Sequence, residues 1–410
     1  MTAPQAWLTI VGIGDDGWDG LSVHAKDAVE QSGLIIGSVR QLRLLPDSIV
    51  QRSESWSGDI TALLKSLKRA QKKHGTICLL ASGDPMWHGL GASLSTHLDM
   101  EEFCVLPGIS SRSWAAARLG WALQEVICLS FHNRPVNLLH SHIAPRTRLL
   151  LLSRDGNTPG MVAKLLCERG YGSSAIWVLE HLGGEHERIR KTRAEGFDLM
   201  DIASLNVVAV EVSQHCDKNH TALFGLADEL FFHDGNITRR DLRAMALARL
   251  ACPPGSLLWD VGAGSGSLSV EWMRLHHDNR AIAIEAREDR CRLIESNRDV
   301  FGVPELRICT GTAPQMFESL PTPNAIFVGG GVSADGVLTA SWNSLRTGGC
   351  MVAHAVSVEG EATLVKFRRE VGGELLRIGC ERLDALGSME GWRPLRSVVM
   401  FSAYKNGTPK

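Results

Sequence analysis

The sequence predicts an α/β protein built from two domains, residues 1–217 and 218–410. Its length of 410 residues exceeds what one hydrophobic core usually organises. In both halves short apolar runs alternate with helical stretches, and a polar stretch, Ser213–Asn219, separates the halves like a linker. A glycine-rich loop follows the first apolar run of each half. The composition, 44% apolar and 21% charged, is that of a globular protein.

The first half contains eight short apolar runs that we expect to form strands. They are Leu8–Val11, Leu34–Gly37, Thr76–Leu80, Phe103–Leu106, Val126–Ser130, Leu149–Leu152, Ala175–Glu180 and Asn206–Val212. The first six are followed by loops rich in Gly, Pro, Asn or Asp and alternate with helical stretches, which places binding sites at the carboxyl ends of strands. The last two lack this helical spacing, so we expect a more antiparallel segment there.

The second half restarts the pattern after the linker. Thr238 is a candidate N-cap for an amphipathic helix over Arg239–Leu250. Apolar runs then predict strands at Leu257–Val261, Ala281–Ile284, Leu306–Cys309, Ala325–Val328 and Cys350–Ala355. A last strand at Val398–Ala403 follows a hairpin-like approach from Leu375–Ile378. This order predicts a doubly wound, Rossmann-like sheet with a late antiparallel strand.

The overall charge and the cysteines narrow the classes of function. A net charge of −2 provides no basic field, so neither nucleic acid nor a membrane is an expected partner. The first residues do not spell a signal peptide and no apolar run nears 18 residues, which favours a cytoplasmic location. The ten cysteines form no CxxC pair, so we expect neither a metal site nor a disulfide framework.

The first glycine loop, residues 12–17, is spelled GxGxxG, the dinucleotide fingerprint. As an oxidoreductase, the protein would place Arg40 and Arg43 on an NADP phosphate. However, Asp15 and Asp16 lie inside the loop and would put two carboxylates beside a pyrophosphate. The local chemistry therefore argues against a dinucleotide at this loop.

The second glycine loop, Asp260–Gly266, is spelled GxGxG. Glu285 ends the next predicted strand, where an acid suits hydrogen bonds to both hydroxyls of a ribose. The glycine loop, the acid after the next strand and the order of the strands together favour a binding site for S-adenosylmethionine (SAM). They argue against a site for NAD and against a turn with a purely structural role. The loop after the fourth strand, Asn324–Gly331, carries three glycines instead of the Asn/Asp-Pro-Pro-aromatic motif of enzymes that methylate DNA bases.

The second half resembles the decarboxylating precorrin methyltransferases, class I SAM enzymes of cobalamin biosynthesis. The matching stretches are His233–Arg243, residues 260–266, Gly311–Pro314 and Phe327–Gly331. The resemblance implies SAM contacts at Thr238, Gly262, Ala263, Gly264, Ser265, Gly266, Glu285 and Ala313. Thr312 stands where many members have an aspartate, so a partner for the adenine amine is missing.

The first half resembles the tetrapyrrole methylases, a class III SAM-binding fold with two α/β lobes. It matches at Val11–Gly14, Ala81–Met86, Leu106–Ser111, Ser130–Arg134 and Asn157–Gly160. The resemblance implies a SAM site between the lobes, with contacts from Gly83, Asp84, Pro85, Met86, Ser110 and Ser111. Ser82 replaces a glycine that many relatives carry.

Together the two resemblances imply a bifunctional SAM-dependent C-methyltransferase with one SAM per domain. The first domain would methylate carbon 5 of precorrin-6B; the second would methylate carbon 15 and decarboxylate the acetate on carbon 12, giving precorrin-8X. Two alternatives stay open: one half is a silent binding module, or the natural tetrapyrrole carries cobalt. The resemblance also implies a homo-oligomer.

The implied substrate is a polycarboxylate, so cationic side chains should line both sites. We expect substrate contacts from His132 and Arg134 in the first domain, and from Arg240 and Arg243 in the second. His354, at the end of the fifth strand of the second half, is a candidate proton shuttle. Structural roles remain open for all five, and the sequence identifies no catalytic acid or base.

Overall fold

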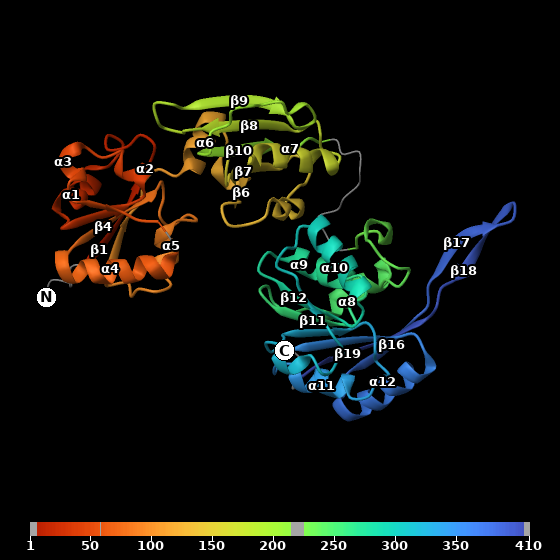
Figure 1. Cartoon of the computed structure of the whole chain (residues 1–410). Helices are drawn as coiled ribbons and strands as arrows, with labels where there is room; N and C mark the ends of the chain where they lie inside the picture. Colours follow the sequence, from red (N-terminus) through yellow and green to blue (C-terminus); the bar gives the residue numbers. More distant parts are fainter. Residues whose placement is uncertain (1–5, 58, 215–224, 406–410) are drawn as a thin grey trace. The chain divides into compact units, whose positions relative to one another are not determined.

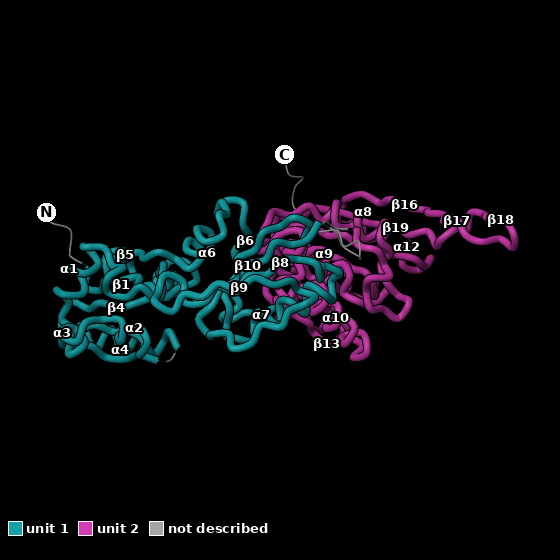
Figure 2. The backbone as a smooth tube through the Cα atoms, turned by 90° about the horizontal axis from the view of Figure 1, so that it is seen from above, with its two compact units in different colours: residues 1–136, 144–218 teal, residues 137–143, 219–410 magenta. Residues whose placement is uncertain are grey.

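The structure, a computed structural model, describes residues 6–57, 59–214 and 225–405. The chain divides into two compact units, residues 1–136 with 144–218 and residues 137–143 with 219–410 (Figure 2). Most of the expected linker Ser213–Asn219, and the expected boundary at 217/218, lie outside the described residues.

The first lobe of unit 1 is a five-stranded parallel sheet with the order β3-β2-β4-β1-β5 (Figure 1). Its strands are β1 Leu8–Ile13, β2 Leu34–Gly37, β3 Ser53–Ser55, β4 Ile77–Ser82 and β5 Phe103–Leu106. Its helices are α1 Val23–Gln31, α2 Val39–Leu42, α3 Asp47–Val50, α4 Ile60–His74 and α5 Leu90–Leu94. Because β4, β1 and β5 are neighbours and parallel, their carboxyl ends meet at one edge of the sheet.

Helix α4 shows why this layer forms. Asp59 caps it by accepting a hydrogen bond from the Ala62 N–H at 2.7 Å. Leu63, Leu67 and Ala70 recur at helical spacing and are buried in the core under the sheet. The helix ends at Gly75, whose φ of 76° suits glycine.

The second lobe of unit 1 is a mixed sheet with the order β6-β7-β10-β8-β9. Its strands are β6 Val126–Ser130, β7 Arg148–Leu152, β8 Ala175–Glu180, β9 Arg188–Arg193 and β10 Asn206–Glu211. Its helices are α6 Ser111–Leu119 and α7 Thr158–Glu168, with short 3-10 turns at η1 Leu123–Glu125 and η3 Ala194–Gly196. A further 3-10 turn, η2 Val136–Ser141, falls in unit 2 except for its first residue. Only β6 and β7 pair in parallel, which confirms the predicted change to antiparallel pairing.

Unit 2 is built on a seven-stranded sheet with the order β13-β12-β11-β14-β15-β19-β16. The strands are β11 Leu257–Val261, β12 Arg280–Glu285, β13 Arg307–Thr310, β14 Ala325–Val328, β15 Cys350–Ala355, β16 Glu374–Ile378 and β19 Val398–Tyr404. The first five pair in parallel, and β19 pairs antiparallel with both β15 and β16, as the sequence predicts.

Helices cover both faces of this sheet (Figure 1). They are α8 Arg240–Leu250, α9 Ser267–Leu275, α10 Glu288–Val300, α11 Val337–Ser344 and α12 Val358–Val371, with 3-10 turns at η4 Asp228–Leu230 and η5 Phe317–Ser319. Apolar residues of α8, α9 and α10 fill one core cluster, while those of α11 and α12 fill the other. Strands that are buried on both faces consist of continuous apolar residues. Because of this pattern, the sequence predicts them clearly.

Two details of unit 2 differ from the sequence prediction. Helix α8 begins at Arg240 with Arg239 as its N-cap residue, and no side chain caps it, so the predicted capping by Thr238 is wrong. The sequence prediction also missed a two-stranded hairpin of β17 Glu381–Leu386 and β18 Met389–Pro394. This hairpin projects from the rest of unit 2 (Figures 1 and 2). Its strands are exposed along most of their length, so no buried apolar pattern announces them.

Among the described residues, no helix combines the length and the apolar character that crossing a bilayer requires.

Candidate functional site

Unit 1 contains a cavity of about 740 Å³ between its two lobes. This volume lies in the range of small-molecule sites. Among the SAM and substrate contacts expected in this unit, five line it: Gly83, Asp84, Ser110, Ser111 and His132. Pro85, Met86 and Arg134 are not among its lining residues, although Pro85 and Met86 continue the lining loop.

Three loops at the carboxyl ends of β1, β4 and β5 are joined backbone to backbone beside this cavity. The Gly83 N–H donates to the Ile13 carbonyl at 2.9 Å, and the Gly108 N–H donates to the Gly83 carbonyl at 3.1 Å. A Cβ on Gly12 would lie 2.0 Å from the Gly83 oxygen and 2.3 Å from the Gly108 nitrogen. Gly12 therefore serves close packing of the three loops.

Two predicted contact residues also hold their own loops in shape. An Asp84 carboxylate oxygen accepts the Met86 N–H at 2.9 Å, which ties the Gly-Asp-Pro turn together. Ser110 is the N-cap of α6, and its hydroxyl accepts the Ser113 N–H at 3.3 Å. Both residues thus present the loop backbone to the cavity in a fixed geometry.

The sequence analysis missed a polar network that joins the lobes at the cavity wall. One carboxylate oxygen of Asp15 accepts from Arg40 Nη1 at 2.9 Å, and the other lies 2.8 Å from His181 Nδ1. Arg40 also donates to the Ser82 hydroxyl at 2.9 Å. Since Asp15 and Ser82 already engage Arg40, the structure gives it a role other than the NADP phosphate contact of the oxidoreductase alternative. All four residues line the cavity.

Cationic and aromatic side chains gather near the Gly-Asp-Pro loop. The Arg112 guanidinium lies 4.9 Å from the ring centre of Trp87, a cavity-lining residue. The pKa of His88 is lowered by burial and by the nearby charges of Arg134 and Arg112. Arg134 thus lies close enough to shape the field at the cavity wall. Cations at this position suit a polycarboxylate ligand.

In unit 2, the predicted glycine loop lies at the carboxyl end of β11. Gly262, Gly264 and Gly266 all have positive φ, between 60° and 71°. A Cβ on Gly262 would lie 2.8 Å from the backbone of Gly330 in the loop after β14. Glycine at position 262 therefore lets the two loops pack backbone against backbone.

Glu285 ends β12 beside this loop and is buried. Its carboxylate accepts the Gly264 N–H at 2.8 Å and the Arg287 N–H at 3.1 Å. The Ser265 hydroxyl is buried and has no hydrogen-bond partner among the described residues. Ala313 follows β13, the neighbour of β12, at the same edge of the sheet. A fixed carboxylate beside open glycine backbone and an unpartnered hydroxyl fits a ligand with a ribose.

Asp260, just before the loop, is fully buried, and burial raises its pKa to about 6. One carboxylate oxygen accepts both the N–H and the hydroxyl of Ser269, at 3.2 and 2.7 Å. Asp260 therefore anchors the start of α9 against the end of β11.

Arg243 does not face a substrate, contrary to the sequence prediction, because its side chain is completely buried. Its guanidinium pairs with Glu271 at 2.7 Å and Asp228 at 3.1 Å. It also donates to the carbonyl oxygens of Thr238 and Leu226. Arg243 therefore holds the segment before α8 onto α9, whereas Arg240 is exposed at the helix start.

His354 is buried at the end of β15, with its ring edge-on to Phe327. Its Nε2 has no hydrogen-bond partner among the described residues, and burial lowers its pKa to about 4. The imidazole is thus neutral at physiological pH. Its suggested role as a proton shuttle stays a prediction.

We predict that His354→Leu removes an acid sensitivity of unit 2. Between pH 6.5 and 4, His354 binds a proton in the unfolded chain but not in the folded chain. The free energy of unfolding of the wild type therefore decreases as the pH is lowered through this range. At pH 5, His354 lowers the free energy of unfolding by about 2 kcal/mol relative to its effect at pH 7.5. Asp260, whose pKa is raised, acts in the opposite direction but is common to both proteins. Denaturant unfolding at both pH values measures the difference; the same pH dependence in both proteins would contradict it.

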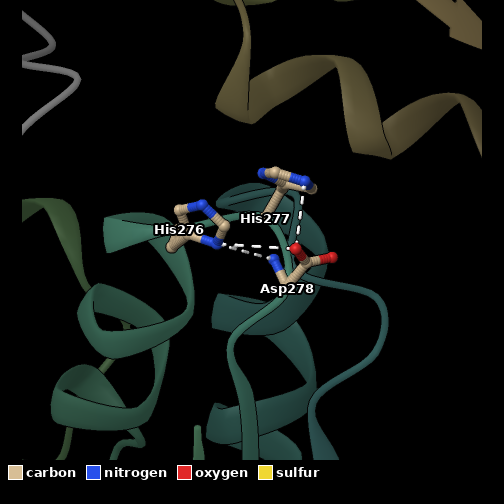
Figure 3. A group of neighbouring side chains, drawn as sticks. All are labelled: His276, His277 and Asp278. Carbon is tan, nitrogen blue, oxygen red and sulfur yellow. Dashed lines mark hydrogen bonds and ion pairs between the residues drawn. The ribbon is translucent and has the colours of Figure 1, made fainter. Parts of the chain in front are cut away.

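A separate cluster of His276, His277 and Asp278 follows α9 (Figure 3). The Asp278 carboxylate lies 3.3 Å from His277 Nε2 and 3.8 Å from His276 Nδ1. The Asp278 N–H also donates to His276 Nδ1 at 3.2 Å. The three side chains thus form a local surface network.

The comparisons with known proteins cover nearly the whole chain. Residues 7–198 match the family described as Tetrapyrrole (Corrin/Porphyrin) Methylases, and residues 229–405 match the Precorrin methyltransferase domain. A precorrin-6Y C(5,15)-methyltransferase (decarboxylating) of Sinorhizobium sp is 41% identical over 97% of this chain and 96% of that protein.

Two shorter relatives each cover 44% of this chain. A cobalt-precorrin-7 C(5)-methyltransferase of Salmonella typhimurium is 30% identical across 88% of its own length. A cobalt-precorrin-6B C(15)-methyltransferase (decarboxylating) of Pyrobaculum calidifontis is 30% identical across 95% of its own length.

Proposed function

The chain belongs to the precorrin-6Y C5,15-methyltransferases (decarboxylating), and from this we propose what each unit contributes. The enzyme is a SAM-dependent, decarboxylating C-methyltransferase of cobalamin biosynthesis that acts on a tetrapyrrole. We assign methylation of carbon 5 to residues 1–217. Methylation of carbon 15 and loss of the carbon 12 acetate carboxyl group are assigned to residues 218–410. The observation that carries this assignment is that each unit has its own glycine-built site at the carboxyl edge of a parallel sheet.

The site in unit 1 supports the proposal through its size and its unpartnered donors. The indole N–H groups of Trp56 and Trp114 are buried without partners among the described residues, and both side chains line the cavity. We propose that Gly83, Asp84, Ser110 and Ser111 hold SAM there, with Pro85 and Met86 shaping the loop. SAM supplies an activated methyl group when bound. The chain must therefore align the acceptor carbon, exclude water and accept the proton.

In unit 2 we propose that residues 262–266, Glu285, Ala313 and Thr238 form the SAM site. The Glu285 carboxylate would accept hydrogen bonds from the ribose hydroxyls. The hydrogen bonds that it accepts from the N–H groups of Gly264 and Arg287 already fix its orientation. The exposed Arg240 is placed to bind an acetate or propionate group of the macrocycle. With Arg243 committed to its buried pairs, Arg240 is the remaining predicted arginine for that task.

Replacing Glu285 with glutamine tests this assignment. Two charge-assisted hydrogen bonds to a ribose contribute about 1.5–3 kcal/mol each, so we expect SAM affinity at this site to fall about 10²-fold or more. Carbon 15 methylation and decarboxylation should fall with it, while SAM binding in unit 1 stays unchanged. Calorimetric titration of the intact chain measures both sites. Unchanged affinity at both sites would remove Glu285 from the proposal.

The cobalt-containing alternative is not favoured. The two relatives described above whose names include cobalt each match 44% of this chain, whereas the fused relative matches 97% and its name does not include cobalt. We therefore propose a metal-free precorrin as substrate. We propose a cytoplasmic enzyme that does not act on nucleic acid, since a net charge of −2 provides no basic field.

We also propose a homo-oligomer held by the hairpin β17–β18. Leu383, Leu386, Met389 and Trp392 on this hairpin are each more than half exposed, although they are large and apolar. A two-stranded hairpin alone is marginally stable in water, and each of its strands pairs only with the other in the described part of the chain. A second copy would cover these side chains and pair a free edge.

We expect Trp392→Asp to reduce the number of protomers per assembly. Light scattering after gel filtration gives the molar mass of the wild type, of Trp392→Asp and of a control, Met100→Asp, which changes an exposed apolar residue of unit 1. A lower molar mass for Trp392→Asp, with Met100→Asp equal to the wild type, supports the hairpin interface. A wild-type monomer, or equal masses in all three, contradicts it.

A further inference from the structure

His181 is held in an unusual position in the wall of the unit 1 cavity. It follows β8 and has a φ of 50°, in the left-handed region that non-glycine residues rarely adopt. Such strain persists where the surroundings fix it, and it concentrates at active sites. Here the fixing contact is to the other lobe, through Nδ1 to Asp15 at 2.8 Å.

The second ring nitrogen of His181 is free. Its Nε2 makes no hydrogen bond to any residue that the structure describes, and the residue lines the cavity. In a neutral imidazole, donation of the Nδ1 N–H to Asp15 leaves Nε2 with its lone pair available. Arg40 pairs with the other Asp15 oxygen at 2.9 Å and holds that carboxylate in place. The ring centre of His186 lies 6.1 Å from that of His181.

We propose that His181 Nε2 accepts the proton released at carbon 5 during methylation in unit 1, with Asp15 as its positioning residue. This inference rests on the proposed function of that unit. Replacing a hydrogen by a methyl group at carbon 5 releases one proton. The methyl–sulfur bond breaks as the methyl–carbon bond forms; the C–H bond then breaks, its electron pair returns to the macrocycle, and the proton passes to Nε2. Asp15 stabilises the imidazolium that results.

The other polar groups of the cavity suit this role less well. Asp84 is engaged in its own turn through the Met86 N–H. His88 lies near Arg112 and Arg134, which disfavour a second positive charge there. His132 has no carboxylate partner among the described residues. Only His181 combines a cavity position, a carboxylate on one nitrogen and a free second nitrogen in the described part of unit 1.

The test uses the intact chain with His181→Ala, Asp15→Asn and a matched control, His186→Ala. We expect His181→Ala to lower kcat for carbon 5 methylation about 10²–10⁴-fold, the usual contribution of a general base. KM and SAM affinity should change little, and added imidazole should restore part of the rate. Asp15→Asn should lower kcat less than His181→Ala does, and His186→Ala should have the kcat of the wild type.

A second readout needs neither substrate nor SAM. Long-range ¹⁵N–¹H NMR of the wild type should show His181 with a protonated Nδ1 and an unprotonated Nε2, and Asp15→Asn should lose this preference. A wild type that transfers no methyl to carbon 5 would overturn the proposed function of unit 1. A wild type that does, with His181→Ala equally fast or with Nε2 protonated in the NMR spectrum, would overturn this inference alone.

Discussion

Gly12→Ala is expected to abolish carbon 5 methylation. Carbon 15 methylation and decarboxylation, which we assign to unit 2, should be unchanged. The new Cβ would lie 2.0 Å from the Gly83 oxygen and 2.3 Å from the Gly108 nitrogen, and both are backbone atoms. Real Cβ atoms do not approach backbone so closely, so the three loops must separate. Because those loops form the cavity wall, we expect SAM affinity in unit 1 to fall at least about 10²-fold; a 1 Å misplacement already has effects of that size.

The control for this substitution is Gly196→Ala, also in unit 1. A Cβ on Gly196 meets nothing within 4 Å, and its φ is not positive. Calorimetry and product mass spectrometry should therefore match the wild type. If Gly12→Ala retains both SAM affinity and carbon 5 methylation, the three-loop junction is not part of the site.

Arg243→Met is expected to destabilise unit 2 by about 3–5 kcal/mol, the usual effect of removing one member of a buried ion pair. Asp228 and Glu271 are both buried, so two carboxylates would lose their shared cation. Glu271 would keep its bonds from the N–H groups of Gly225 and Leu226, at 2.6 and 3.0 Å. The carbonyls of Leu226 and Thr238 would lose their donor.

Arg240→Met is the matched control, because Arg240 begins the same helix but is exposed. It should leave unfolding unchanged and raise KM for the tetrapyrrole. Differential scanning calorimetry and hydrogen exchange of unit 2 peptides measure the first effect, and steady-state kinetics the second. An Arg243→Met protein as stable as the wild type would return Arg243 to the candidate substrate contacts.

The sequence predicts the strands of both units well because nearly all of them are buried apolar runs. β14, for example, reads Ala-Ile-Phe-Val and is buried throughout. The exposed strands β3, β9, β17 and β18 were missed for the opposite reason, since most of their side chains face water and carry no apolar signal. Element boundaries moved by a residue or two, as with α8, whose start lacks the predicted cap.

The candidate sites were only partly predictable. Motifs mark the glycine loops because backbone geometry restricts those positions to glycine, as at Gly262. The partner of a charged side chain depends on contacts distant in sequence, which spacing does not reveal. Asp15 and His181 are 166 residues apart. Arg243 illustrates the same limit, since its position in the first turn of α8 suggested a docking cation until its two buried carboxylates were located.

Titration of the intact chain with SAM by calorimetry tests the central claim most directly. Two independent sites, one in each unit, predict a stoichiometry of two SAM per chain. Gly12→Ala should remove the site in unit 1 and Glu285→Gln should weaken the site in unit 2, each without affecting the other. A wild-type stoichiometry of one, or a single substitution that removes both sites, would contradict the account.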